Sequence, residues 1–189
     1  MTVTPKATAK SRAGAVREEE FISNGVISIG IDPGSRYTAL VVRDGDTVLH
    51  ATTVKREGAQ EPIDYARMVV EIMVPIVRDF EERYENVVVG IEGITDPKGF
   101  SNGRRAPINP KDIVRTGVTA GGLAIALMDA IIVPPGHNGS QHLSQYPDAL
   151  KGRRPAGLPG DSTGAGTRKH EQSAFDVALK AVERTKDNV

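Results

Sequence analysis

The chain has 189 residues, with 24 Lys and Arg against 24 Asp and Glu, and so carries no formal net charge. This length favours one domain with its own core, plus appendages. The absence of Cys excludes disulfides, thiolate zinc sites and cysteine nucleophiles. No apolar run approaches the roughly 20 residues of a membrane-spanning helix, and the N-terminus has no signal-peptide core. We therefore expect a soluble, cytoplasmic protein without a membrane partner.

The first part of the chain divides into a polar arm and a three-stranded meander. Residues 1–22 are mostly small and polar, which predicts a disordered N-terminal arm before a folded domain over 23–189. β-Branched residues over 26–31 predict a strand that stops at Asp32-Pro33-Gly34. Strands are also predicted over 37–43 and 47–54, and the Asp-Gly-Asp turn between them predicts an antiparallel hairpin.

The rest of the chain alternates helices and strands. Helical periodicity covers 62–82, where Pro75 should kink or divide the helix. A buried strand follows at 86–91, then a loop over 93–110 and a second helix over 111–128.

A short strand at 130–133 and a final helix over 168–186 flank a Gly- and Pro-rich segment, 134–167, which we expect to be a long, flexible loop with a functional role. The order β-β-β-α-β-α-β-α predicts an α/β fold with a mixed five-stranded sheet and helices on both faces.

Three carboxylates occupy positions where an apolar side chain is expected. Asp32 ends the strand ISIGID, Glu92 ends VVVGIE, and Asp176 lies among apolar residues of the last helix. Taken singly, each has an ordinary explanation: a turn cap for Asp32, an ion pair for Glu92, and exposure to water for Asp176. If all three converge, their mutual repulsion requires a bound cation, and Mg²⁺ or Mn²⁺ prefers such oxygen ligands.

The segments GIDPGS (30–35), VVGIE (88–92) and SAFDVA (173–178) contain these carboxylates. Together they resemble the first strand and turn, the fourth strand and the final helix of RuvC-type Holliday junction resolvases. The resemblance spans about residues 26–184 and looks like that of a divergent, phage-encoded relative. A phage-encoded protein would act in the host cytoplasm.

The resemblance implies an RNase H-like fold, a homodimer, and a role in DNA recombination and repair. Its substrate would be branched DNA, especially four-way junctions, cut by paired phosphodiester hydrolysis. Two Mg²⁺ ions per site, which Mn²⁺ can replace, would activate the attacking water and stabilise the leaving oxygen. Asp32 would bridge the ions, and Glu92 and Asp176 would each hold one.

One site position departs from the family pattern. Bacterial members place an acidic residue or a His one helical turn before the final Asp, where this chain has Ser173. His170, at the entrance of the helix, is a further candidate catalytic residue, and Glu171 is a third candidate for the fourth site position.

Basic residues are concentrated beside two of the proposed ligands, in the loop after Glu92 and in the segment before Asp176. Such clusters suit the DNA phosphate backbone, and Phe100 could stack on an unpaired base. The DNA-binding candidates are Lys98, Phe100, Arg104, Arg105, Lys111, Arg153, Arg154, Arg168 and Lys169.

Three other functions remain open at this point. GIDPGSRYTALVV is also compatible with an ATP-binding domain of the actin and sugar-kinase type, although such proteins need two such domains. A non-catalytic module that binds branched DNA is favoured by Ser173. A nuclease of the same fold could instead act on flaps, forks or RNA.

Overall fold

The computed structural model describes residues 25–94, 100–101, 104–105, 109–152 and 165–187. The predicted N-terminal arm, 1–22, lies outside the described residues, as do residues 153–164 of the predicted loop.

A five-stranded mixed sheet forms the centre of the molecule, as predicted. Its strands are β1 (Ile27–Asp32), β2 (Tyr37–Asp44), β3 (Thr47–Lys55), β4 (Val87–Glu92) and β7 (Ile131–Val133), in the order β3-β2-β1-β4-β7. The first three strands pair antiparallel, whereas β4 runs parallel to both β1 and β7. The sheet thus combines a meander with two crossover connections.

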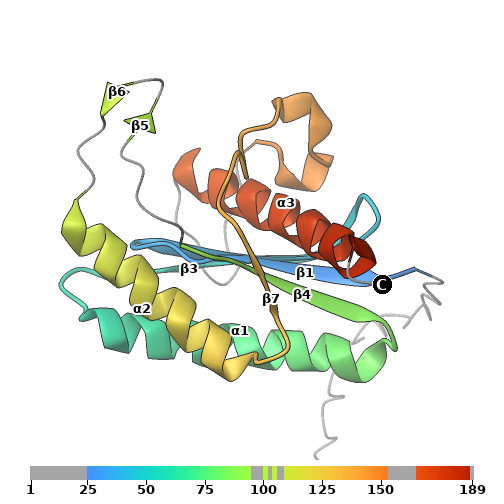
Figure 1. Cartoon of the computed structure of the whole chain (residues 1–189), viewed down its shortest axis with the longest axis horizontal. Helices are drawn as coiled ribbons and strands as arrows, with labels where there is room; N and C mark the ends of the chain where they lie inside the picture. The colour runs from blue at the N-terminus through green and yellow to red at the C-terminus, as the bar shows by residue number, and fades with distance from the viewer. Residues whose placement is uncertain (1–24, 95–99, 102–103, 106–108, 153–164, 188–189) are drawn as a thin grey trace, which may run out of the picture.

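Helices cover both faces of this sheet (Figure 1). On one face lie α1 (Pro62–Arg83) and α2 (Pro110–Ala126), and on the other lies α3 (Ala165–Asp187). The apolar stripe of α1 packs on alternate residues of β1, which gives the larger core cluster. Pro75 does not divide α1, which continues to Arg83.

The alternation of β1 decides which side chains meet α3. Ile27, Ile29 and Ile31 face α1 within the larger core, so Ser28, Gly30 and Asp32 point to the other face. Register with β4 pairs Gly30 with Gly90. A Cβ added to Gly30 would lie 1.9 Å from the backbone oxygen of Ala174, and one added to Gly90 would lie 2.7 Å from Cβ of Ala181. These two glycines let α3 lie directly against the sheet.

Two segments carry structure where loops were predicted. Between β4 and α2 lie two-residue strands, β5 (Phe100–Ser101) and β6 (Arg104–Arg105), which pair antiparallel. In the predicted loop 134–167, residues 134–152 contain short 3₁₀ helices η1 (Leu143–Gln145) and η2 (Asp148–Leu150), and α3 already begins at Ala165.

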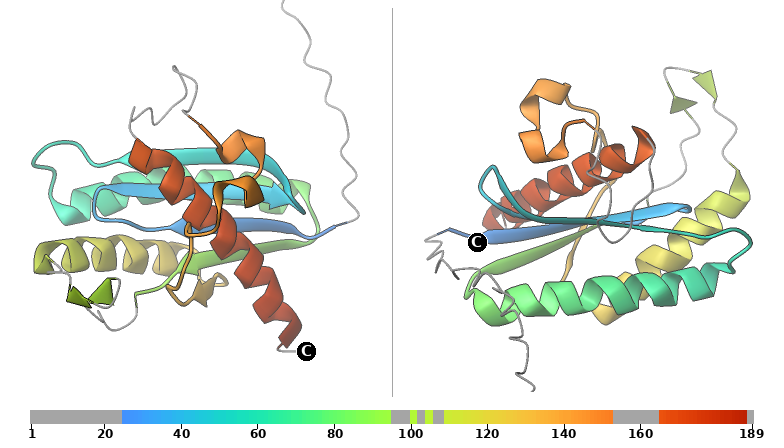
Figure 2. Two further views of the ribbon diagram at one scale, coloured as in Figure 1. Left: turned by 90° about the horizontal axis from the view of Figure 1, so that it is seen from above. Right: turned by 180° about the vertical axis from the view of Figure 1, so that it is seen from behind.

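Residues 134–152 pack on the same face of the sheet as α3 (Figure 2). Tyr146 and Leu150 are buried there against Phe175 of α3 and against Ala39 and Val41 of β2. This part of the predicted loop is therefore packed into the domain core.

Among the residues that the structure describes, no helix combines the length and apolarity needed to cross a membrane.

Candidate functional site

The ends of β1 and β4 bring two carboxylates together. The strands are parallel neighbours with Ile31 opposite Ile91, so Asp32 and Glu92 follow at the same edge and on the face covered by α3. Asp32 is 8% exposed, and Glu92 is partly buried. We call Asp32 and Glu92 the strand-end pair. The predicted juxtaposition of these two residues is present in the structure.

The surroundings of this pair favour the protonated form of Glu92. Burial raises the pKa of Glu92 to about 7, and the charge and hydrogen bond of Asp32 contribute to the increase. Two neutral donors act in the opposite direction: Asn138 Nδ2 donates to Glu92 Oε1 over 2.8 Å, and Ser173 Oγ donates to Oε2 over 3.2 Å. A carboxylate with a pKa near neutrality in a buried pair is typical of a functional site.

His170 completes the cluster from α3. Its Nδ1 lies 2.8 Å from Asp32 Oδ2, and its ring lies 5.7 Å from that of Tyr37. Burial lowers the pKa of His170, but the hydrogen bond and charge of Asp32, with the charge of Glu92, outweigh burial and raise that pKa. His170 and Ser173, one helical turn apart, therefore contact one member of the strand-end pair each.

Glu171, the other candidate for the fourth position, lies elsewhere. Its side chain is fully buried and accepts hydrogen bonds from Thr53 Oγ1 at 3.2 Å and from Arg168 at 2.7 Å. These contacts join α3 to β3 and give Glu171 a structural role.

Asp176 has surroundings different from those of the strand-end pair. Its Oδ2 accepts hydrogen bonds from the backbone N–H of Gly139 and from the hydroxyl of Tyr146, both at 2.8 Å, and its Oδ1 accepts one from Gln141 Nε2 at 3.0 Å. Among the described residues, no group of three or more His, Asp or Glu side chains is arranged to hold a metal ion. The structure thus joins Asp32 with Glu92 and His170, and a ligand role for Asp176 stays a prediction.

The strand-end pair nevertheless fits a divalent cation. Its oxygen donors are those that Mg²⁺ and Mn²⁺ prefer, and a cation between them would relieve the repulsion that contributes to the raised pKa of Glu92. A second ion on Asp176 would compete with the three hydrogen bonds that this carboxylate already accepts.

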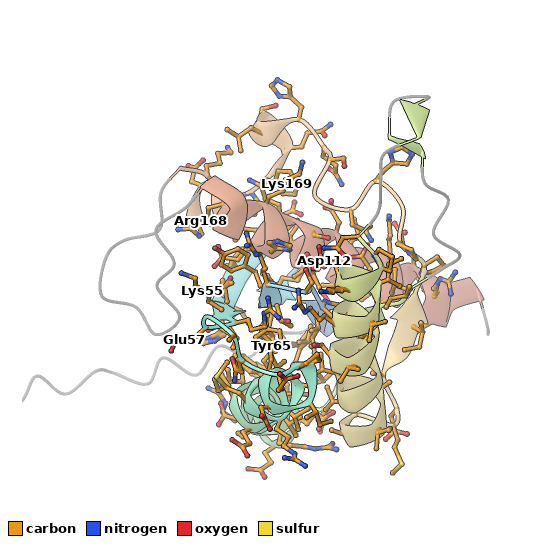
Figure 3. The ribbon with its side chains drawn as sticks, turned by 90° about the vertical axis from the view of Figure 1, so that its left-hand side faces the viewer. Lys55, Glu57, Tyr65, Asp112, Arg168 and Lys169 are labelled. Carbon is orange, nitrogen blue, oxygen red and sulfur yellow. The ribbon has the colours of Figure 1, made fainter. Side chains whose placement is uncertain are left out.

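The predicted DNA-binding residues fall into three groups. Lys111, in the first turn of α2, and Lys169, near the start of α3, are exposed, and Figure 3 shows Lys169 beside Arg168. Arg168 is instead internal, because its guanidinium donates to Glu171 and to the backbone oxygen of Ala149, each at 2.7 Å. The third group lies outside the described residues, either entirely or in its side chains: Lys98, Phe100, Arg104, Arg105, Arg153 and Arg154.

Sequence reasoning did not identify the residues of segment 134–152 that contact the site. Asn138, Gln141 and Tyr146 come from a stretch without hydrophobic periodicity, so no pattern assigned them a place. The one available signal was the Asn138-Gly139 dipeptide, which is typical of a tight turn.

Comparison with known proteins places the fold. No protein-family model and no curated protein matches this sequence. Among solved structures, the chain is similar to RuvC of Thermus thermophilus in complex with a Holliday junction substrate, with a TM-score of 0.53 and 14% identity over 85% of this chain and 95% of that one. A second Thermus thermophilus RuvC structure gives a TM-score of 0.52 and 16% identity over 86% and 97% of the two chains. The protein therefore has the RuvC-like, RNase H-type fold that its motifs predicted.

Proposed function

We propose that this protein is a metal-dependent endonuclease that cuts branched DNA, with the four-way junction as its principal substrate. The observation that carries the proposal is the pairing of Asp32 and Glu92 at the ends of two adjacent parallel strands, with His170 hydrogen-bonded to Asp32. The RuvC-like fold supports the same conclusion, since one similar structure was solved with a Holliday junction substrate.

Asp32 and Glu92 would hold the divalent cation, Mg²⁺ or Mn²⁺. When bound, such a cation lowers the pKa of a water molecule and stabilises negative charge on a phosphate. Ser173 and Asn138 donate hydrogen bonds to the two oxygens of the Glu92 carboxylate. Because Nδ1 of His170 is engaged with Asp32, Nε2 is the ring nitrogen that would hold or release a proton next to the scissile phosphate.

DNA would reach the site along the side where α2 and α3 begin. Lys111 and Lys169 are exposed there and suit phosphate contacts, which position a duplex without reading its sequence. Paired cuts across a junction would require two sites, which a homodimer would supply.

A cleavage assay tests the proposal. Labelled four-way junctions, flaps, forks, linear duplexes and branched RNA are incubated with the wild-type chain and Mg²⁺, and then with Asp32→Asn and Glu92→Gln. We expect the wild-type chain to cut the junction and both variants to leave it intact. Glu85→Gln, an exposed carboxylate just before β4, is the matched control and should cut like the wild type.

The second candidate is a non-catalytic module that binds branched DNA. It is favoured by the serine at position 173 and by the three hydrogen bonds that Asp176 already accepts. Junction binding without cleavage by the wild-type chain, at any Mg²⁺ or Mn²⁺ concentration, would support this module. Preferential cleavage of flaps, forks or RNA would keep the enzyme and change its substrate.

A further inference from the structure

Segment 134–152 places one polar side chain directly on the strand-end pair. Asn138 Nδ2 donates to Glu92 Oε1 over 2.8 Å, while Ser173 holds the other oxygen of the same carboxylate. Asn138 lies 46 residues from Glu92 along the chain, so only the folding of this segment creates the contact.

Lys180 of α3 fixes which way the Asn138 amide faces. Its ammonium group donates to Asn138 Oδ1 and also to the backbone oxygen of Gly136 at 2.7 Å. An ammonium group can only donate hydrogen bonds and a carboxylate can only accept them. With Lys180 on one side and Glu92 on the other, the amide therefore has one favourable orientation, with its oxygen on Lys180 and its NH₂ on Glu92.

The backbone on both sides of Asn138 has an unusual conformation. His137 adopts φ 56° and Gly139 adopts φ 68°, so Asn138 stands between two residues in the left-handed region. Such a conformation is unfavourable for a residue other than glycine and persists when its surroundings impose it. The N–H of Ser140 closes the turn on the backbone oxygen of His137 at 3.1 Å.

Asp176 holds this turn on α3. It accepts hydrogen bonds from the N–H of Gly139, from Gln141 and from Tyr146, three groups of the same segment. A Cβ at Gly139 would lie 2.9 Å from the backbone oxygen of Lys169, so the turn lies directly against the helix. Asp176 and Lys180, one helical turn apart, thus anchor the segment on either side of Asn138.

We propose that Asn138 is a positioning residue that orients Glu92, and that Lys180 and Asp176 are its supports on α3. Asn138 acts through Glu92 and needs no contact with DNA. An effect of Asn138 on DNA cleavage rests on the function proposed above. The orientation of Glu92 by Asn138 does not depend on that function. Residues that orient a ligand typically contribute about 10- to 100-fold to metal affinity.

Mn²⁺ binding to the full-length chain tests the proposal without DNA. The variant Asn138→Leu removes both hydrogen bonds of the amide at similar volume. Lys180→Met keeps Asn138 but removes the donor to its amide oxygen and to the backbone oxygen of Gly136. We expect Mn²⁺ affinity, measured by calorimetry, to fall about tenfold in Asn138→Leu and less in Lys180→Met. Lys180→Arg, which keeps a positively charged donor at this position, should bind Mn²⁺ like the wild type. So should the control Gln145→Ala, at an exposed position of η1 in the same segment. An affinity within twofold of the wild type in Asn138→Leu would overturn the proposal.

A metal-free crystal structure of Asn138→Leu separates this proposal from the proposed function. We expect the Glu92 carboxylate to rotate away from the position it has in the wild-type chain, whether or not the protein cuts DNA or binds Mn²⁺. An unchanged Glu92 in that structure would overturn the role of Asn138 even in an active nuclease. If Glu92 rotates in the variant and the wild-type chain cuts no junction, the positioning role is upheld and the nuclease function is rejected.

Discussion

The strand-end pair and Asp176 are buried carboxylates on the same face of the same sheet, yet their surroundings differ. Asp32 and Glu92 face each other, and burial together with that proximity raises the pKa of Glu92 to about 7. Asp176 is 2% exposed and accepts three hydrogen bonds from neutral donors. Both Glu92 and Asp176 accept hydrogen bonds from neutral donors, so what sets Glu92 apart is the second carboxylate beside it, whose charge a bound cation would compensate.

Replacement of Asp32 tests whether the strand-end pair carries the proposed activity. In Asp32→Asn we expect the rate of junction cleavage to fall about a thousandfold, because the several kcal/mol that a bound cation supplies to the transition state would be lost. Single-turnover cleavage of a labelled junction measures this effect. Cleavage by Asp32→Asn at the wild-type rate would show that Asp32 has no catalytic role.

Replacement of Asp176 tests whether this carboxylate serves stability rather than metal binding. In Asp176→Ala, three donors lose their acceptor, two of them in buried hydrogen bonds, so we expect the free energy of unfolding to fall by about 3 kcal/mol. Urea unfolding of the metal-free protein measures this. Wild-type stability combined with lost Mn²⁺ affinity would show instead that Asp176 is the metal ligand that its motif suggests.

The pH dependence of stability should also report on the strand-end pair. Since the pKa of Glu92 is about 7 in the folded protein, above its ordinary value of 4.5, the folded state binds more protons than the unfolded state between these values. The metal-free protein should therefore lose stability, on the order of 2 kcal/mol, as the pH rises from about 4.5 to about 7.

His170 adds to the same trend. The pKa of His170 is raised, so its contribution is present below the ordinary value of 6.5 and is lost as the pH rises through the raised one. Glu92→Gln should flatten most of this slope in unfolding experiments at several pH values, while Glu85→Gln should leave it unchanged. A slope that persists in full in Glu92→Gln would contradict the assignment to Glu92.

The smallest expected effect concerns the basic residues of α3. Lys169 is exposed, whereas the neighbouring Arg168 is engaged with Glu171. Lys169→Ala should weaken junction binding severalfold and reduce its salt slope by about one, because one phosphate contact is lost. The same variant should keep wild-type stability. Binding titrations at several salt concentrations check this, and an unchanged slope would place the DNA elsewhere.

The fold could be predicted from the sequence because its signals are local. The β-branched runs that end in Asp32 and Glu92, and the apolar stripe of α1, each identify an element without reference to the rest of the chain. The mixed sheet that these elements predicted is confirmed, as is the RuvC-like fold implied by the resemblance of the three carboxylate motifs. The prediction that Pro75 could divide the helix was wrong. The apolar stripe of α1 packs on the sheet on both sides of Pro75, and the helix is continuous.

The candidate site could be predicted only in part because several of its contacts are long-range. Asp32 and Glu92 follow from strand order, but the contact of Asn138 with Glu92 depends on a segment without periodicity. The internal place of Arg168 could not be read either, since its partner Glu171 is buried only once α3 packs on β3.

The bare backbone at Gly30 and Gly90 has a consequence for how this protein can change. A single methyl group at either position would collide with α3 and force the helix off the sheet. His170 and Ser173 would move with it, and both acids would lose a neighbour although neither acid had been altered. The absence of a side chain at these two glycines thus sets the distance between α3 and the sheet, and with it the positions of His170 and Ser173 beside the two acids.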